Sequence, residues 1–297
     1  MSLFSIADLH LSLSCNKPMD KFGSRWTNHT EKLVKRWNAV VTDRDTVIVP
    51  GDISWGISLE EALADLKLIE SLPGTKLLGK GNHDYWWGTL TKMYEFFEAN
   101  DIKTIKFLYN NAYELEDYIV CGTRGWYVEE KLQSVENTDY TKIVNRENAR
   151  LEICLKEATK LQEESGKPIL VYLHFPPVFK NFICRELVDT MKKYDIKNCY
   201  FGHMHGQYNV PRTFEFEGIS MTLISSDFLD FIPMITMLLF WCGVRVVYVN
   251  SILHYIPKFE MISWAYPITW TLSSIVLTVC LLTVNWERAF EKRKLKN

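Results

Sequence analysis

The stretch TKLLGKGNHD, residues 75–84, begins as an apolar strand and ends in a polar cluster that contains glycine. DTVIVPGD, residues 45–52, has the same form and ends in Gly51-Asp52. Short apolar strands of this kind are typical of parallel sheets that are covered on both faces. Since open α/β sheets bind ligands at the carboxyl ends of their strands, the polar clusters mark the expected site.

Strands and helices alternate along the chain, which favours an α/β fold. A helix is predicted at 58–72, where Ser58 is the cap and Glu61 completes a capping box. Two more helices are predicted at 145–164 and 185–194. Further strands are predicted at 3–11, 118–126, 168–177 and 197–206, with a closing hairpin at 213–226.

Five polar clusters follow predicted strands: Asp8-Leu9-His10, Gly51-Asp52, Gly81-Asn82-His83-Asp84, His174 and Gly202-His203-Met204-His205-Gly206. They contain five of the seven histidines. Carboxylate, imidazole and amide donors suit Mn, Fe or Zn, and no thiolate is present to favour a structural zinc site. One such motif alone is compatible with an ordinary turn or a hydrogen-bonded histidine. All five in this order predict a metal centre.

In this order the clusters resemble those of the calcineurin-like metallophosphoesterases, over roughly residues 3–234. GDISWG (51–56), GNHDYWW (81–87) and CGTRGW (121–126) are similar to a bacterial subfamily. The resemblance implies a four-layer α/β/β/α sandwich with two central sheets and a dinuclear metal centre.

The resemblance also implies a role for each polar residue of the clusters. Seven would hold two divalent or trivalent ions: Asp8, His10 and His205 on one, Asn82, His174 and His203 on the other, and Asp52 bridging both. His83 would stand beside the leaving group, with Asp84 orienting its ring. In such a centre a hydroxide between the ions attacks phosphorus in line, and a protonated His83 donates to the departing alkoxide.

The run after Gly51-Asp52 departs from one branch of the family. Protein Ser/Thr phosphatases of the family have a V-D-R-G type run there, whose arginine grips phosphate, whereas this chain has Ile53-Ser54-Trp55-Gly56. That difference argues against a protein phosphatase. Arg124 is the candidate for phosphate contact, and an exposed surface arginine is the alternative.

Aromatic residues are frequent in and beside the clusters: Trp26, Trp55, Tyr85, Trp86, Trp87, Trp126 and Tyr127. Such side chains either wall a substrate pocket or pack the loops that hold the metals. Packing is the commoner role. Trp55 and Tyr85 are the candidates for substrate contact.

The net charge bears on the kind of binding partner, and the cysteine content bears on the cellular compartment. Residues 1–234 carry a net charge of −6 and residues 235–297 carry +4, which together give −2. The acidic main part offers no electrostatic basis for a nucleic-acid partner. Seven scattered cysteines without a CxxC pair fit a reducing compartment. The first residues lack the basic region of a signal peptide, so none is predicted.

Two apolar segments, at about 232–256 and 262–284, follow the domain predicted at 1–233. The second is uncharged and long enough to span a bilayer, whereas Arg245 interrupts the first. The basic end should stay cytoplasmic. We therefore expect a hydrophobic helical hairpin within 234–297 that anchors a cytoplasmic catalytic domain to the membrane. Two buried core helices are the alternative.

Residues 234–290 are also similar to the last two helices of multidrug and toxic compound extrusion (MATE) transporters. This resemblance implies that a phosphoesterase has been joined to the end of a transporter, either as a functional gene fusion or as a sequence artefact. Two of the twelve helices of such transporters cannot form a transport path, so no transport is expected.

Two functions from different classes are compatible with these features. The first is a metal-dependent phosphoesterase that hydrolyses a small or nucleotide-like phosphomonoester or phosphodiester. The second is a membrane-anchored protein whose phosphoesterase-like domain binds or senses a phosphorylated ligand with little turnover. A binding protein would be free to lose Asp52 or His83, and the presence of both favours the enzyme.

Overall fold

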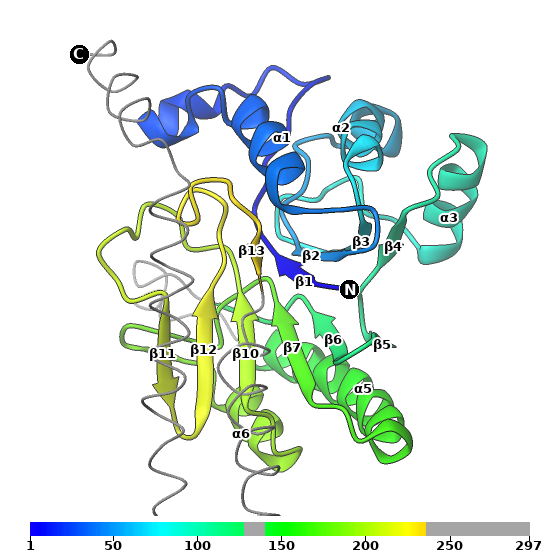
Figure 1. Ribbon diagram of the computed structural model, residues 1–297. Coiled ribbons are helices and arrows are strands. Elements are labelled where there is room, and N and C mark those ends of the chain that lie inside the picture. The colour runs from blue at the N-terminus through cyan, green and yellow to red at the C-terminus, as the bar shows by residue number, and fades with distance from the viewer. Residues whose placement is uncertain (128–139, 236–297) are drawn as a thin grey trace, which may run out of the picture. The chain divides into compact units, whose positions relative to one another are not determined.

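The computed structural model describes residues 1–127 and 140–235. Two main β-sheets form the centre of the fold (Figure 1). The first has the strand order β13-β1-β2-β3-β4 and the second β11-β12-β10-β7-β6-β5. The strands of the first sheet are β1 (Leu3–Ser5), β2 (Thr46–Pro50), β3 (Thr75–Gly79), β4 (Ile105–Phe107) and β13 (Met234–Ile235). Those of the second are β5 (Asn111–Glu114), β6 (Ile119–Thr123), β7 (Ile169–Leu173), β10 (Asn198–Phe201), β11 (Thr213–Phe216) and β12 (Ile219–Leu223). A small hairpin pairs β8 (Val178–Phe179) with β9 (Phe182–Ile183).

The inner strands of both sheets run parallel. β1 to β4 pair in parallel, as do β6, β7, β10 and β12, while β13, β5 and β11 add antiparallel edges. The predicted α/β class with parallel strands is therefore confirmed. Each predicted strand contains an observed one, but the short strands β4, β5, β8, β9 and β13 were not predicted.

Helices accompany each sheet: α1 (His29–Val40), α2 (Leu59–Ser71), α3 (Leu90–Ala99), α5 (Thr141–Ser165) and α6 (Arg185–Lys193). The three predicted helices correspond to α2, α5 and α6. The expected cap of α2 is present, because Ser58 Oγ accepts from the Glu61 N–H at 3.3 Å. The return bond of the capping box shifts by one residue, since the Glu61 carboxylate accepts from the N–H of Ile57.

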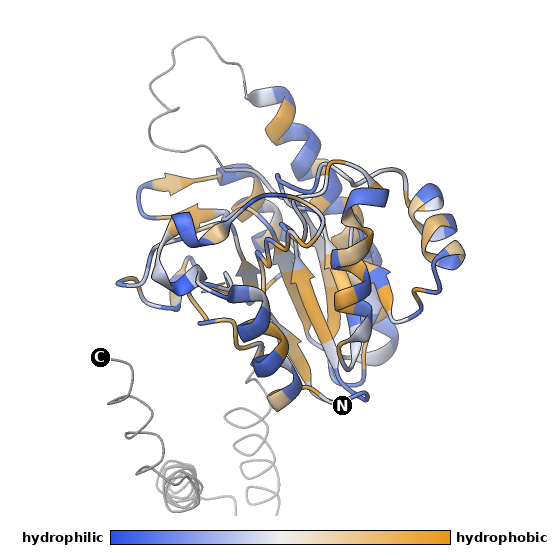
Figure 2. Cartoon of the chain, turned by 90° about the horizontal axis from the view of Figure 1, so that it is seen from above, coloured by the Kyte–Doolittle hydropathy of each residue, from blue (hydrophilic) through white to orange (hydrophobic). Residues whose placement is uncertain are grey.

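The two sheets face each other across a buried layer. α5 and α6 pack on one face of the six-stranded sheet, where Leu151 and Val188 join Val171 in one apolar core. On the other face, Ser5 Oγ donates to the Tyr172 hydroxyl at 3.0 Å, which links β1 to β7. Hydrophobic residues are concentrated in the strands, while the helices carry both hydrophilic and hydrophobic residues (Figure 2). This arrangement brings the carboxyl ends of the central strands of both sheets together.

The C-terminal prediction falls mostly outside the described residues. Met1–Ile235 forms one compact unit, and the predicted hairpin and its similarity to a transporter concern residues beyond it. Met234 and Ile235, at the beginning of the first predicted apolar segment, form β13 and pair with β1; the rest of that segment lies outside the described residues. In the part of the chain that the structure describes, no helix is long and apolar enough to cross a membrane.

Candidate metal centre

The loops that follow the central strands are tied together by hydrogen bonds. The N–H groups of Asp8 and His10 donate to the carbonyls of Gly51 and Asp52 at 3.0 and 2.9 Å. The His203 N–H donates to Asp8 Oδ2 at 2.8 Å and thereby connects the two sheets. These bonds hold polar side chains from distant parts of the sequence at one sheet edge.

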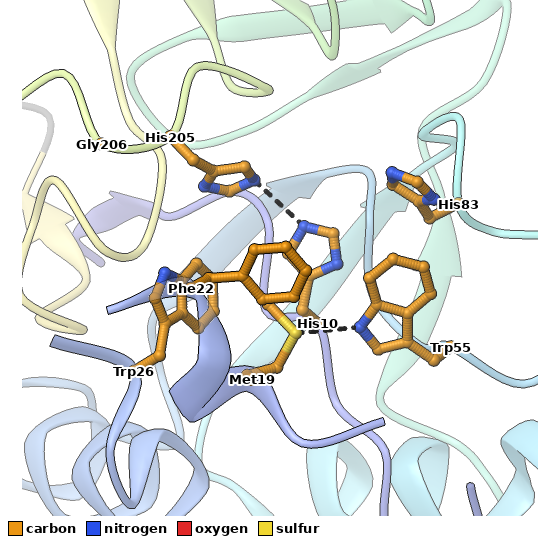
Figure 3. Close-up of a pocket in the computed structure, with 8 residues that line it drawn as sticks. All are labelled: His10, Met19, Phe22, Trp26, Trp55, His83, His205 and Gly206. Carbon is orange, nitrogen blue, oxygen red and sulfur yellow. Dashed lines mark hydrogen bonds between the residues drawn. The ribbon is translucent and has the colours of Figure 1, made fainter. Parts of the chain in front are cut away.

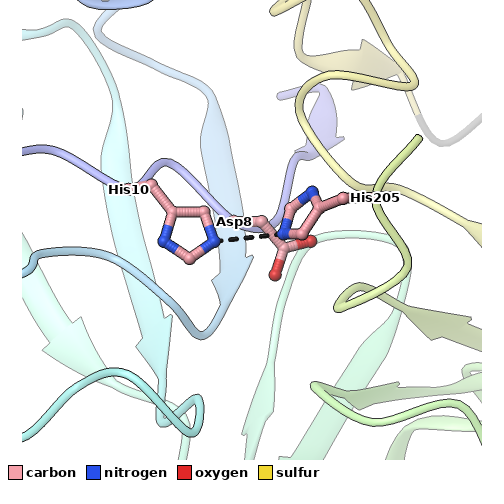
Figure 4. Close-up of side chains that lie close together, drawn as sticks. All are labelled: Asp8, His10 and His205. Carbon is pink, nitrogen blue, oxygen red and sulfur yellow. Dashed lines mark hydrogen bonds between the residues drawn. The ribbon is translucent and has the colours of Figure 1, made fainter. Parts of the chain in front are cut away.

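The first group of potential ligands contains Asp8, His10 and His205 (Figure 4). One donor atom from each lies within 4.8 Å of the other two. The Nε2 atoms of His10 and His205 are 3.1 Å apart. Asp8 and His10 are buried, whereas His205 is half-buried. The structure thus brings together the residues predicted for one ion.

The second group contains Asp52, His174 and His203, whose donor atoms also lie within 4.8 Å of one another. Asn82 lies beside this group, because its Oδ1 is 2.7 Å from His174 Nε2. His174 and Asp52 are buried, and His203 and Asn82 are half-buried. All four residues predicted around the second ion therefore meet.

Asp52 lies between the two groups. Its Oδ1 accepts from the His83 N–H at 2.8 Å. Its Oδ2 is buried without a hydrogen-bond partner among the described residues, and it lies 3.5 Å from His10 Nε2 and 3.6 Å from His174 Nε2. A buried carboxylate oxygen without a donor is costly unless a cation compensates it. This placement fits metal ions on both sides of Asp52.

Burial shifts the pKa values of the carboxylates and the imidazoles toward their neutral forms, and a bound cation would lower the pKa of the carboxylates again. Burial, together with the charges of Asp84 and Asp8, raises the pKa of Asp52 well above its usual range. Burial likewise raises the pKa of Asp8 to about 6. For His10 and His174, burial lowers the pKa well below the usual value, which leaves neutral imidazoles. Neutral imidazole and carboxylate are the forms that bind metals.

Four residues of the two groups have a left-handed backbone: Asp8 (φ 62°), His10 (φ 46°), Asp52 (φ 53°) and His203 (φ 68°). This conformation is uncommon outside glycine, and each such residue costs on the order of 1–3 kcal/mol. Strain of this kind persists where the surrounding structure over-determines it, and it clusters at functional sites. These four residues all belong to the candidate ligand groups.

Two glycines leave room for the carboxylates. A Cβ at Gly81 would lie 2.0 Å from Asp52 Oδ1, and a Cβ at Gly202 would lie 2.6 Å from Asp8 Oδ2. Any side chain at either position would have to displace a carboxylate. Gly81 and Gly202 are therefore required for the close approach of the loops.

The structure corrects the predicted role of Asp84. Its carboxylate accepts from the N–H groups of Asp52 and Gly81, both at 2.8 Å, and of Ile53 at 2.8 Å, so its oxygens are occupied by backbone donors. His83 Nδ1 is buried and has no hydrogen-bond partner in the described part of the chain, so Asp84 does not orient this ring. Asp84 instead fixes the loops after β2 and β3 to each other.

Asp227 was not among the site residues predicted from the sequence. It is buried, and its Oδ1 lies 2.9 Å from His205 Nδ1. Burial alone would lower the pKa of His205, but the hydrogen bond to Asp227 and the charges of Asp8 and Asp227 raise it. This bond directs His205 Nε2 toward the first group. Asp227 follows β12, so the rule that polar residues gather after strands could have identified it.

Arg124 lies outside both groups. Its Nη2 is 3.3 Å from Glu147 Oε1 on α5, and Arg150 reaches the same oxygen at 2.7 Å. Glu147 is fully buried. The Arg124 carbonyl also accepts from the N–H of His174 at 3.1 Å. Arg124 thus has a buried ion-pair partner, and its contact with phosphate stays a prediction.

The aromatic residues divide into two sets. Trp86 and Trp87 are buried, and Trp86 Nε1 donates to Asp84 Oδ1 at 3.0 Å, so they pack the loops. Trp26 and Trp55 line a cavity of about 340 Å³ together with His83 (Figure 3). Tyr85 is outside the lining and is mostly exposed. Of the two predicted substrate contacts, only Trp55 therefore faces this cavity.

Comparisons with known proteins identify one family for this chain. The pattern of the family described as calcineurin-like phosphoesterase matches residues 1–207. Among solved structures, the chain is similar to AQ665 from Aquifex aeolicus, a protein of unknown function, with 15% identity, a TM-score of 0.40, and coverage of 79% of this chain and 95% of that one. It is also similar to TT1561 of Thermus thermophilus, with 12% identity, a TM-score of 0.45, and coverage of 76% and 89%. No curated protein matches it. Because the match to one family spans well over half of the sequence and includes both candidate ligand groups, this chain belongs to the calcineurin-like phosphoesterase family.

Proposed function

We propose that the chain is a hydrolase that cleaves a phosphomonoester or phosphodiester with two metal ions, on a four-layer α/β/β/α sandwich. The observation that carries the proposal is the position of Asp52. Its buried Oδ2, which has no hydrogen-bond partner among residues 1–127 and 140–235, lies within 3.6 Å of a histidine from each group. Facing sheets with helices packed on the outer side of one of them support the layered arrangement.

Seven of the site residues would hold the ions, and His83 would contact the substrate. Asp8, His10 and His205 would hold one ion; Asn82, His174 and His203 would hold the other; and Asp52 would bridge them. Bound Mn, Fe or Zn would supply Lewis-acid neutralisation of the phosphate charge and lower the pKa of water. His83 lines the cavity beside the first group and can donate a proton to the departing oxygen.

A substrate panel tests this function. The purified full chain should hydrolyse phosphoesters after addition of Mn²⁺, Fe²⁺ or Zn²⁺, and a chelator should abolish the reaction until metal is restored. Nucleotide, sugar, lipid-like and aryl esters, each as a monoester and a diester, would define the class of substrate. Binding of phosphorylated ligands without turnover under every metal would favour the alternative of a sensing protein.

Gly81→Ala should weaken metal binding. The new Cβ would meet Asp52 Oδ1 at 2.0 Å, so the bridging carboxylate must move. We expect a loss of about 10–100-fold in metal affinity, as for other changes that misplace a ligand. Gly88→Ala is the matched control, because no atom of the described residues lies within 4 Å of a Cβ there. Equal affinities of both variants, measured by calorimetry, would refute the proposed position of Asp52.

Asp227→Asn should act through His205. The neutral amide removes the carboxylate that orients the ring at 2.9 Å, and we expect metal affinity to fall about 10–100-fold. Asp230→Asn, a more exposed change in the same segment, should have little effect. Titration with Mn²⁺ measures both variants. Unchanged affinity in Asp227→Asn would mean that His205 is not a ligand, or that its orientation does not depend on Asp227.

A further inference from the structure

The cavity beside the first ligand group has two kinds of wall. One wall consists of the imidazoles of His10, His83 and His205 (Figure 3). The rest is mainly apolar and comes from Met19, Phe22, Trp26 and Trp55. Within the described part of the chain, no carboxylate, lysine or arginine lines it. Its volume of about 340 Å³ is at the lower end of small-molecule sites.

The side chains of the apolar wall contact one another and the histidines. Trp55 stacks on His10 with ring centroids 5.0 Å apart and approaches His83 to 4.4 Å. Its Nε1 also donates to Met19 Sδ at 3.2 Å. On the other side, Trp26 packs edge-on against His205 at 5.3 Å. The wall is therefore largely formed before any ligand arrives.

Phe22 is the exception, because 67% of its side chain is exposed although it lines the cavity. It belongs to the short helical turn η1 (Met19–Phe22). An exposed aromatic ring at the edge of an apolar cavity next to reactive groups marks a ligand site more readily than a packing position. A ligand in the cavity would cover this ring.

We infer that this cavity receives the organic group of the substrate and that this group is apolar. The inference rests on the proposed function. The phosphoryl group must reach the ion that Asp8, His10 and His205 would hold, and the departing oxygen must reach His83. The organic group that follows that oxygen then meets the apolar wall. A sugar or peptide there would lose water from its polar groups without gaining partners. An aryl or alkyl group would gain from burial.

Two pairs of esters with similar leaving groups test the inference with the metal-loaded full chain. These are naphthyl and phenyl phosphate, and hexyl and ethyl phosphate, each as a monoester and as a methyl diester. We expect kcat/KM to be about tenfold higher for the larger member of a pair. The aryl and alkyl pairs distinguish an aromatic from a lipid-like group.

Phe22→Ala should reduce that preference to about two- to threefold, with the larger loss of kcat/KM falling on the naphthyl and hexyl esters. Phe22→Leu should retain most of the preference. Ile153→Ala, an exposed apolar residue on α5, is the control and should leave it unchanged. Equal rates for both members of each pair, or a preference untouched by Phe22→Ala, would overturn the inference. Failure to hydrolyse any ester would instead overturn the proposed function.

Discussion

Asp52→Asn should remove metal binding and hydrolysis together. The substitution keeps the size of the side chain but replaces the buried oxygen that lies between both histidine groups by an amide. Because two ions would share this carboxylate, we expect both to be lost, with a fall in rate on the order of 10³-fold or more. Metal content by mass spectrometry and hydrolysis of the best ester from the panel measure the two effects.

The folding of this variant provides a control. In the metal-free protein, burial and two neighbouring carboxylates raise the pKa of Asp52, so its charge is unfavourable there. Without metal, Asp52→Asn should therefore have a Tm equal to or above that of the wild type. Asp189→Asn, an exposed change on α6, should retain metals and activity. An Asp52→Asn variant that keeps two ions and full activity would contradict the bridging role.

His83→Ala should keep both ions and lose about 10²–10⁴-fold in rate, the usual contribution of a general acid. His83 lines the cavity but belongs to neither ligand group. Burial and the charges of His205 and Lys17 lower its pKa, so the free protein holds it mainly neutral at pH 7. The protonated fraction of His83 would supply the proton, and the neutral ring can still donate a hydrogen bond from its N–H group to the departing oxygen.

The leaving group decides between two roles for His83. Nitrophenyl esters leave without a proton, so the loss in His83→Ala should be small for them and large for alkyl esters. His83→Gln, which can still donate a hydrogen bond, should recover part of the rate on alkyl esters. An equal loss on both classes would indicate stabilisation of transition-state charge instead, and loss of metal would indicate that His83 is a ligand.

Much of the site could be predicted because its signals are local in the sequence. Asp8, Asp52, Asn82, His174 and His203 each lie within three residues of the end of an apolar strand. Parallel strands place such residues at one edge. The short edge strands β4, β5 and β13 carry too few residues for a clear apolar pattern, so their pairing depends on neighbours that the sequence does not reveal.

The remaining features depend on packing between distant segments. Asp84 was expected to face His83, its neighbour in sequence, but the carboxylate is occupied by N–H groups from the loop after β2. Trp55 and Tyr85 were both candidates for substrate contact, yet Trp55 faces the cavity and Tyr85 is mostly exposed outside its lining. The position of Asp227 after β12 could have marked it as a site residue, but its pairing with His205 depends on the alignment of β12 with β10.

The most direct test of the dinuclear account is a titration of the metal-free full chain with Mn²⁺, with bound metal and phosphoester hydrolysis measured on the same samples. The account predicts two ions per chain, with hydrolysis that rises mainly as the second ion binds and disappears with a chelator. Binding of no ion or a single ion at saturation, or hydrolysis that persists in the chelator, would contradict it.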